Sequence, residues 1–199
     1  MFARRRLWRK SAAFVRAQGS VLTAANGCFF KSVAHRRECS ASVSLAFLGG
    51  FVVRFFYGLM SRITGDIDYC TAIPNVANLR DLAGSTSALA QKHKIYLQRV
   101  TVTELPEEYD TRLTEKFPNQ FRNLRLYAPD PYDLMLSKLE RNSGKDREGA
   151  VYLFQEQKLD LAVFEEQYQK ELRPNLSNPG REDLTLKLWI EMFQAEAER

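Results

Sequence analysis

The sequence predicts an α/β or α+β protein in which a half made of strands and helices is followed by an all-helical half. Short segments rich in β-formers alternate with helical segments up to about residue 128, and from residue 129 on apolar residues recur only at helical spacing. A hydrophobic content of 45% and an aromatic content of 12% argue for a folded globule rather than a disordered chain. At 199 residues, the chain is long enough for one domain with a real core, with or without an appendage.

The first 40 residues differ from the rest in charge. They hold nine Lys or Arg residues and one acid, Glu38, whereas residues 41–199 carry a net charge of −3. The basic pI therefore belongs to this segment and gives no argument for a nucleic-acid groove in the globular body. The segment has the composition of an organellar presequence, but it also fits a disordered arm, an over-extended start site, a nucleic-acid or membrane-surface arm, or a helix packed on the body. We expect residues 1–40 to be poorly ordered, 41–128 to form the core and 129–199 to form a helical portion packed on it.

The first half predicts alternating strands and short helices. Its expected elements are a buried strand over 43–48 ending at Gly49-Gly50, a short helix over 51–60, a turn over 62–65, a strand over 66–70, a helix over 76–92, a strand over 94–103 and a short strand over 124–127. Each helix places Phe or Leu side chains on one face. Pro106 ends the strand over 94–103, and residues 107–121 are a polar excursion without a clear pattern.

The second half predicts four helices, over 131–141, 145–157, 161–172 and 182–198. Asp130-Pro131 is a strong helix start, because an aspartate caps well and proline suits the first helical position. Asn142-Ser143-Gly144 separates the first two helices. The last helix has apolar residues at i, i+4, i+5, i+8 and i+9, which are Leu184, Leu188, Trp189, Met192 and Phe193.

Neither a membrane span nor a cysteine-based metal site is predicted. The most apolar run, residues 43–60, has Arg54 in its middle and is interrupted by Gly49-Gly50, and a buried charge there would cost several kcal/mol. The three cysteines, Cys28, Cys39 and Cys70, have no CxxC or Cys/His ligand spacing, and their odd number without a signal peptide indicates a reducing, cytoplasmic location.

Asp66-Ile67-Asp68 is the strongest candidate for a site that performs chemistry. Two carboxylates at i and i+2 of a strand point to the same face, and like charges that close repel each other unless a cation lies between them. Oxygen ligands favour a hard ion such as Mg²⁺, which commonly binds one or two carboxylates together with substrate phosphates. The upstream pair Gly49-Gly50 has no side chains to block a bulky anion. These residues together predict a site for a metal and a phosphate.

The motifs follow one another in a recognisable order. Leu48-Gly49-Gly50 is followed by a short helix, then by Arg62-Ile63-Thr64-Gly65-Asp66-Ile67-Asp68, and later by Asp130-Pro131-Tyr132-Asp133-Leu134-Met135-Leu136-Ser137-Lys138-Leu139 with Arg141 and Lys145-Asp146-Arg147 after it. Over residues 43–160 this order resembles the core of the DNA polymerase β-type nucleotidyltransferase superfamily. It is closer still to small bacterial nucleotidyltransferase-like domains, of which one branch is catalogued only as a domain of unknown function. Another branch comprises the abortive-infection-type toxins of toxin–antitoxin pairs.

The resemblance implies a small mixed sheet with flanking helices and a role for each motif. Asp66 and Asp68 would hold Mg²⁺, while Gly49 and Gly50 would let backbone amides approach the phosphates of an NTP. Arg62 and Thr64 would assist at the turn, Lys138 would contact a phosphate, and Asp146 would orient Lys138 or assist the acceptor. The implied activity transfers a nucleotide from an NTP to an RNA, such as tRNA, or to a protein, and an antitoxin protein is the implied partner.

The chain also departs from the pattern. Relatives commonly have a third carboxylate on a neighbouring strand, but neither alternating set of the strand over 94–103 contains an acid, and Glu104 comes only at its end. Gly149 stands where relatives often have a further Asp. A degenerate module that binds a nucleotide or a protein is therefore the alternative, followed by a purely structural globule. In those interpretations Asp66 and Asp68 are a surface pair, Lys138 is an exposed helix lysine, and residues 145–147 are a solvated helix start.

Overall fold

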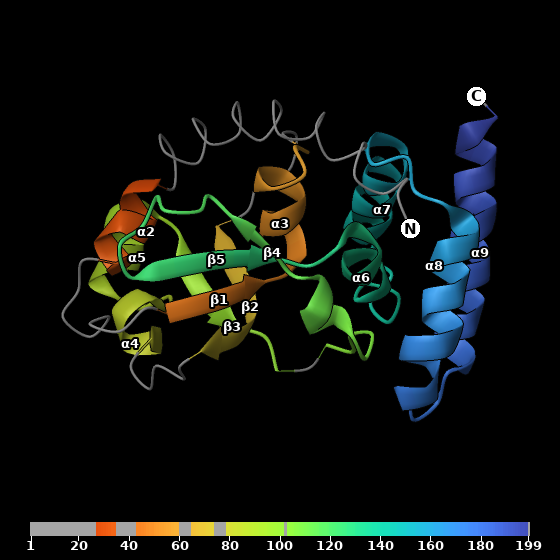
Figure 1. Cartoon of the computed structure of the whole chain (residues 1–199), viewed down its shortest axis with the longest axis horizontal. Helices are drawn as coiled ribbons and strands as arrows, with labels where there is room; N and C mark the ends of the chain where they lie inside the picture. Colours follow the sequence, from red (N-terminus) through yellow and green to blue (C-terminus); the bar gives the residue numbers. More distant parts are fainter. Residues whose placement is uncertain (1–26, 35–42, 60–64, 74–78, 102, 199) are drawn as a thin grey trace. The chain divides into compact units, whose positions relative to one another are not determined.

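The structure, a computed structural model, describes residues 27–34, 43–59, 65–73, 79–101 and 103–198 (Figure 1). These residues divide into two units. The sheet unit comprises the described residues up to Arg99 together with Glu115–Tyr127, and the helical unit comprises Val100–Thr114 and the residues from Ala128 on. The chain therefore passes between the units three times. The expected boundary at 128/129 did not include the excursion of residues 100–114 into the helical unit.

A five-stranded mixed sheet forms the centre of the sheet unit, which agrees with the expected fold class. Its order is β3-β2-β1-β5-β4, with β1 antiparallel to β2 and parallel to β5, and β2 parallel to β3. The strands are β1 (Val43–Phe47), β2 (Asp66–Ile73), β3 (Tyr96–Arg99), β4 (Thr114–Lys116) and β5 (Leu124–Ala128). The strand predicted over 66–70 is three residues longer, because its second half pairs with β1 as far as Ser44↔Ile73. The strand predicted over 94–103 is shorter and ends at Arg99.

Phenylalanines fill the core beneath this sheet. Phe30 lies 5.9, 6.0 and 5.8 Å, between ring centroids, from Phe47, Phe51 and Phe121, and all four rings are buried. Phe47 comes from β1, and Phe51 comes from the helix that follows it, α3 (Gly49–Phe55). Tilted and edge-on ring contacts at these distances add to the stabilisation from apolar burial. This packing fixes α3, and with it the glycine pair at its start, against the sheet.

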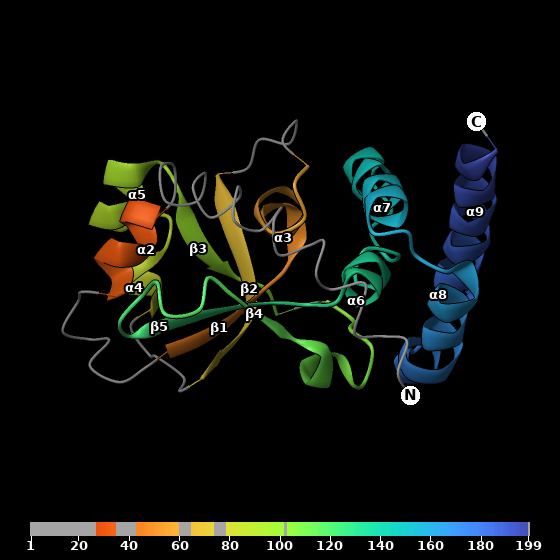
Figure 2. The same ribbon diagram turned by 45° about the horizontal axis from the view of Figure 1, so that its top comes forward.

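Part of the basic N-terminal segment is packed into this core. Residues 27–34 form α2 (Gly27–Ala34), whose Phe29, Phe30 and Val33 are fully buried and which lies beside α5 (Ala88–His93) in both views (Figure 1, Figure 2). The expected poor order does not apply to these eight residues, because a charge count over 40 residues hides one short apolar helix. The rest of the segment lies outside the described residues.

The helix predicted over 76–92 is divided in two. The described part comprises α4 (Leu79–Ala83) and α5, separated by the turn at Gly84. The Ser87 hydroxyl accepts a hydrogen bond of 3.0 Å from the Ala90 amide and so caps the second helix. A serine with this capping role starts a new helix instead of continuing the first.

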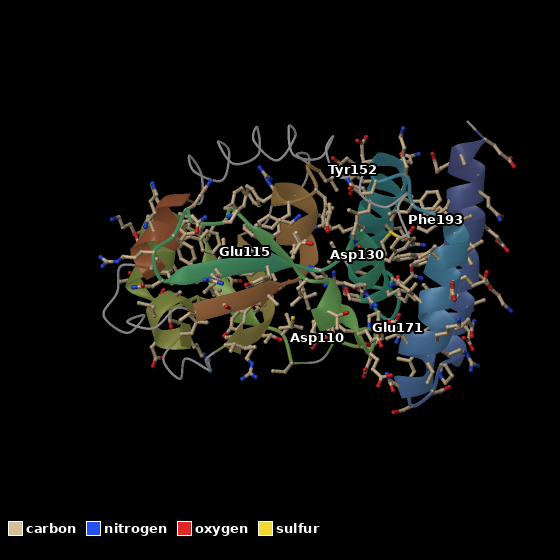
Figure 3. All side chains as sticks on the ribbon, viewed as in Figure 1. Asp110, Glu115, Asp130, Tyr152, Glu171 and Phe193 are labelled. Atoms are coloured by element: carbon tan, nitrogen blue, oxygen red, sulfur yellow. The ribbon has the colours of Figure 1, made fainter. Side chains whose placement is uncertain are left out.

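The helical unit contains α6 (Pro131–Leu136), α7 (Gly144–Glu156), α8 (Leu161–Gln167) and α9 (Gly180–Ala197), with the one-turn segments η2 (Tyr109–Arg112), η3 (Tyr168–Leu172) and η4 (Arg173–Asn175). The predicted start at Asp130-Pro131 is confirmed, since the Asp130 carboxylate accepts a 2.9 Å bond from the Tyr132 amide. However, α6 ends at Leu136 rather than near residue 141. Phe193 of α9 stacks on Phe154 of α7 at 4.6 Å, and Figure 3 labels it.

Two leucines of α9 face away from this core. Leu184 and Leu188 were predicted to lie on the apolar face, yet they are 60% and 49% exposed, while Trp189 and Phe193 are buried. The buried face instead includes Glu182 and Thr185. Among the helices that the structure describes, none is both long enough and apolar enough to cross a membrane.

Candidate functional site

Asp66 and Asp68 lie on the same face of β2. Both side chains are half-buried, whereas Ile67 and Tyr69 between and after them are 1% and 7% exposed on the opposite face. The alternation of burial along the strand follows the period of two expected for side chains in a β-strand. Both carboxylates therefore lie on one accessible face of the strand, as the sequence predicted.

Gly49 lies directly against Asp68. The glycine has φ = +70°, and a Cβ atom added there would lie 2.5 Å from Oδ2 of Asp68. The Leu48 amide also donates a 2.9 Å hydrogen bond to the Asp68 carbonyl, which ties the end of β1 to β2. Glycine is needed here both because the backbone is left-handed and because a side chain would collide with the carboxylate. Gly50 is buried at the start of α3, and Arg62 and Thr64 lie outside the described residues.

Strand β3 provides the other neighbours of the carboxylates. In the parallel ladder, Asp66 pairs with Tyr96 and Asp68 pairs with Gln98. Of the two alternating sets in this strand, the set that shares the face of the carboxylates is therefore the one with Tyr96 and Gln98, which contains no acid. Glu104, the first acid after the strand, belongs to the helical unit. Among the described residues, β3 provides no third carboxylate to this face.

Mg²⁺ fits these residues only in part. No described group of three or more His, Cys, Asp or Glu side chains is arranged to hold a metal ion. Two carboxylates are nevertheless a common protein contribution to a Mg²⁺ site when phosphates and water supply the other ligands. Asp66 and Asp68 are therefore the residues that could hold the ion, together with a phosphorylated ligand.

Lys138 and Asp146 meet in the helical unit. The Nζ atom of Lys138 lies 3.5 Å from Oδ1 of Asp146, and these side chains are 3% and 0% exposed. Lys138 follows the end of α6, and Asp146 is in the first turn of α7. The alternative of an exposed helix lysine is wrong, because Lys138 is buried. Residues 145–147 do start a helix and Lys145 and Arg147 are exposed, but Asp146 is buried there rather than solvated.

Asp146 has further partners that account for its burial. Arg141 donates two hydrogen bonds to its carboxylate, at 2.6 and 2.8 Å, and the Ser143 hydroxyl donates a third at 2.6 Å. Ser143 and Asp146 also form a capping box at the start of α7. Burial by itself would raise the pKa of Asp146, but the hydrogen bonds from Arg141 and Ser143, with the charges of Lys138 and Arg141, lower it well below its usual range. Asp146 is thus an ionised anchor beside Lys138.

A second buried carboxylate was not singled out from the sequence. Asp133 of α6 is fully buried and forms a two-bond pair with Arg112, at 2.9 and 2.7 Å, while Arg112 also donates to Glu171 at 3.2 and 2.6 Å. Burial raises the pKa of Asp133, and its bonds to Arg112 offset only part of that effect. The group joins η2, α6 and η3. In the sequence, Arg112 lies 21 positions from Asp133 and 59 positions from Glu171. No local pattern links residues that far apart, so only the fold reveals this group.

The comparisons with known proteins gave one match. No curated protein and no solved structure matches the chain. A family model does match, over residues 39–193, which is more than half of the chain and includes both units. The chain belongs to the family described as nucleotidyltransferase of unknown function (DUF6036).

Proposed function

We propose that the protein is a Mg²⁺-dependent nucleotidyltransferase that moves a nucleotide from an NTP to an RNA or protein acceptor. One observation supports the proposal most: Asp66 and Asp68 share a half-exposed face, and the Asp68 carboxylate lies against Gly49, where any side chain would displace it. Membership of a nucleotidyltransferase family supports the same class of reaction.

In this proposal each residue has a limited role. Asp66 and Asp68 would hold Mg²⁺, which when bound would neutralise phosphate charge and assist attack on the α-phosphorus. Gly49 and Gly50 would let backbone amides approach the phosphates of the NTP, and Arg62 and Thr64 are kept as candidates for binding it. Lys138 is kept as a cation for a phosphate group, with Asp146 as the residue that holds its ammonium group in place.

A catalytically degenerate module that only binds a nucleotide or a partner protein is the second candidate. The neutral neighbours of the carboxylates, Tyr96 and Gln98, favour it, because no acid of β3 is available to deprotonate an acceptor hydroxyl. A module that binds a nucleotide predicts the same NTP binding as the enzyme and differs from it only in transfer.

Thermal-shift titration with each NTP, with and without Mg²⁺, tests the binding that both candidates share. We expect an NTP to raise the unfolding temperature only with Mg²⁺, and Asp66→Asn or Asp68→Asn to abolish the rise. Asp81→Asn is the matched control, since Asp81 is an exposed aspartate of the same unit, on α4. Stabilisation by Mg²⁺ and an NTP that survives both substitutions would contradict the metal assignment.

Label transfer from α-³²P-NTPs separates the enzyme from the binder. We expect label in total RNA, with tRNA as the first acceptor to examine, or in protein. The proposal extends to a toxin of a toxin–antitoxin pair, related to the abortive-infection-type enzymes and acting in the cytoplasm. Arrest of growth on expression, relieved by the product of a neighbouring gene, would support that extension. If NTP binds but no label moves, the degenerate module is the correct interpretation.

A further inference from the structure

Exposed side chains form a single stripe along α9. They follow one another at alternating spacings of three and four residues, and the stripe consists of Arg181, Leu184, Leu188, Glu191 and Ala195. This alternation keeps side chains on one side of a helix, and it is the spacing at which two helices pack along their length. We call this stripe the α9 seam.

The middle of the α9 seam is apolar and exposed. Leu184 and Leu188 are 60% and 49% exposed, and among the described residues only Ile73 is a further large exposed hydrophobic residue. A single exposed apolar residue needs no explanation, but two that are one turn apart on the same side of a helix form a patch. In both views α6, α7 and α8 lie on one side of α9, where Phe193 stacks on Phe154 of α7 (Figure 1, Figure 2).

The two leucines are flanked by opposite charges. Arg181 precedes Leu184 by one turn, and Glu191 follows Leu188 by one turn. Arg181 and Glu191 are separated by about 15 Å along the helix, so their side chains are too far apart to pair within one chain. A helix that binds a membrane surface carries mainly cations beside its apolar face, whereas this seam carries both signs. The pattern instead fits a partner helix that presents the same residues in reverse order.

A second α9 that runs in the opposite direction has this reverse order. When two copies are aligned antiparallel with their centres at residue 186, Leu184 of each copy lies opposite Leu188 of the other, and Arg181 lies opposite Glu191. We propose that the α9 seam is an interface with a second copy of this chain, in which the two α9 helices pack antiparallel about a two-fold axis in this register. Each pair of residues then occurs twice, because a two-fold interface uses the same surface of both copies. The inference does not depend on the proposed function.

This interface should be weak. A single helix from each copy buries less than the roughly 800 Å² per partner of a standard interface. Lys187 flanks the middle of the seam, where the two-fold axis would bring it near its counterpart. Its charge is attracted to Asp183 of the same helix, whose pKa is lowered by hydrogen bonds from Arg173 and Tyr168 and also by the charges of Arg173 and Lys187, and this attraction offsets part of the repulsion. We therefore expect a dissociation constant on the order of 10–100 µM.

Sedimentation equilibrium of the full chain between about 1 and 500 µM tests the inference. We expect wild type to pass from monomer to dimer in this range. Leu188→Glu should weaken the dimer at least about a hundredfold, because it would bury two unpaired carboxylates in the interface. Ile73→Glu is the matched control, since it makes the same kind of exchange at an exposed apolar residue of the sheet unit and should leave the dimer unchanged. The unfolding temperature of each variant is measured first, and Leu184→Glu replaces Leu188→Glu if the latter is unfolded.

Exchanging the charges at the two ends of the seam tests the register. Arg181→Glu or Glu191→Arg alone would place like charges opposite each other at both ends, and each should weaken the dimer about fivefold. The double variant restores opposite charges and should return the dissociation constant to near that of wild type. Arg181 also donates a hydrogen bond to the Glu140 carbonyl, but the double variant lacks this bond as well, so recovery reports pairing between the copies.

Three results would overturn the inference. A wild-type protein that stays monomeric at every concentration would show that the α9 seam does not bind a second copy. A dimer that Leu188→Glu leaves intact, or that Ile73→Glu weakens equally, would place the interface elsewhere. A double charge exchange that weakens the dimer as much as the two single exchanges combined would exclude the antiparallel register.

Discussion

Gly49 and Asp68 are in a contact that a single methyl group on the glycine would disturb. The glycine adopts φ = +70°, where an L-residue costs about 1–2 kcal/mol, and the atom nearest to an added Cβ is a carboxylate oxygen at 2.5 Å. The sequence predicted that this glycine pair and the aspartate pair act together. It could not predict that the contact is made by Gly49 rather than Gly50, since that depends on how the end of β1 meets β2.

Gly49→Ala should therefore displace the Asp68 carboxylate as well as strain the backbone. We expect the free energy of unfolding to fall by about 2 kcal/mol and the stabilisation by Mg²⁺ with an NTP to be lost. Chemical denaturation and thermal shift measure the two effects. Gly144→Ala is the control, because nothing lies within 4 Å of its added Cβ, and its stability should stay the same or rise slightly. Unchanged NTP binding in Gly49→Ala would show that Asp68 does not depend on this contact.

Asp146 gives a prediction about pH at the same scale. Asp146→Asn leaves Lys138 buried without its anionic partner, so we expect the protein to lose about 3 kcal/mol of stability at pH 7. The folded pKa of Asp146 lies below its ordinary value of 3.8, so this contribution is complete above about pH 4 and is lost as the pH falls through the folded pKa. The stability difference between the variant and wild type should therefore shrink below pH 4. Urea denaturation at pH 7 and pH 3 measures it, and a difference that grows at pH 3 would contradict the assignment.

At the scale of elements, predictions that depend on neighbouring residues were confirmed more often than predictions that depend on how elements pack together. The start of α6 is confirmed because Asp130 and Pro131 are adjacent residues with local reasons to begin a helix. The prediction of one continuous helix over 76–92 was wrong, because the spacing of apolar residues does not show that Ser87 caps a second helix. The exposed Leu184 and Leu188 have a different cause: α9 turns Trp189 and Phe193 toward α7, and no sequence pattern shows which of two apolar stripes has a neighbour.

Arg112 joins three elements of the helical unit, so replacing this one side chain should lower the stability of the protein strongly. Arg112→Ala leaves Asp133 fully buried without its two hydrogen bonds and frees η2 from α6 and η3. We expect a loss of about 3 kcal/mol in the free energy of unfolding, measured by chemical denaturation. Lys170→Ala is the comparison, since its pair with Glu166 is exposed to solvent and should contribute far less to stability. Equal effects in the two variants would mean that Asp133 does not need Arg112.

At the scale of the whole molecule, the sequence predicted the succession of a mixed α/β half and a helical half, but not how the chain is shared between them. Residues 107–121 showed no pattern because their anchors lie elsewhere: Arg112 is held by Asp133 and Glu171, and the Glu107 amide donates to the Glu171 carbonyl. The excursion over Val100–Thr114 therefore belongs to the helical unit, although it lies between two strands of the sheet unit. Contacts this distant in sequence leave no local signature.

This arrangement predicts how a shortened chain behaves. A protein ending at Ala128 keeps all five strands but lacks Asp133 and Glu171, so the excursion over 100–114 loses the partners that hold it. We expect trypsin to cleave after Arg112 much faster in the shortened protein than in the full chain, because cleavage requires the backbone to open locally. Cleavage after Arg80, on the exposed side of α4, is the internal reference, since its surroundings are retained. If cleavage after Arg112, measured relative to Arg80 by mass spectrometry, is equally slow in both proteins, the excursion is held by the sheet unit instead.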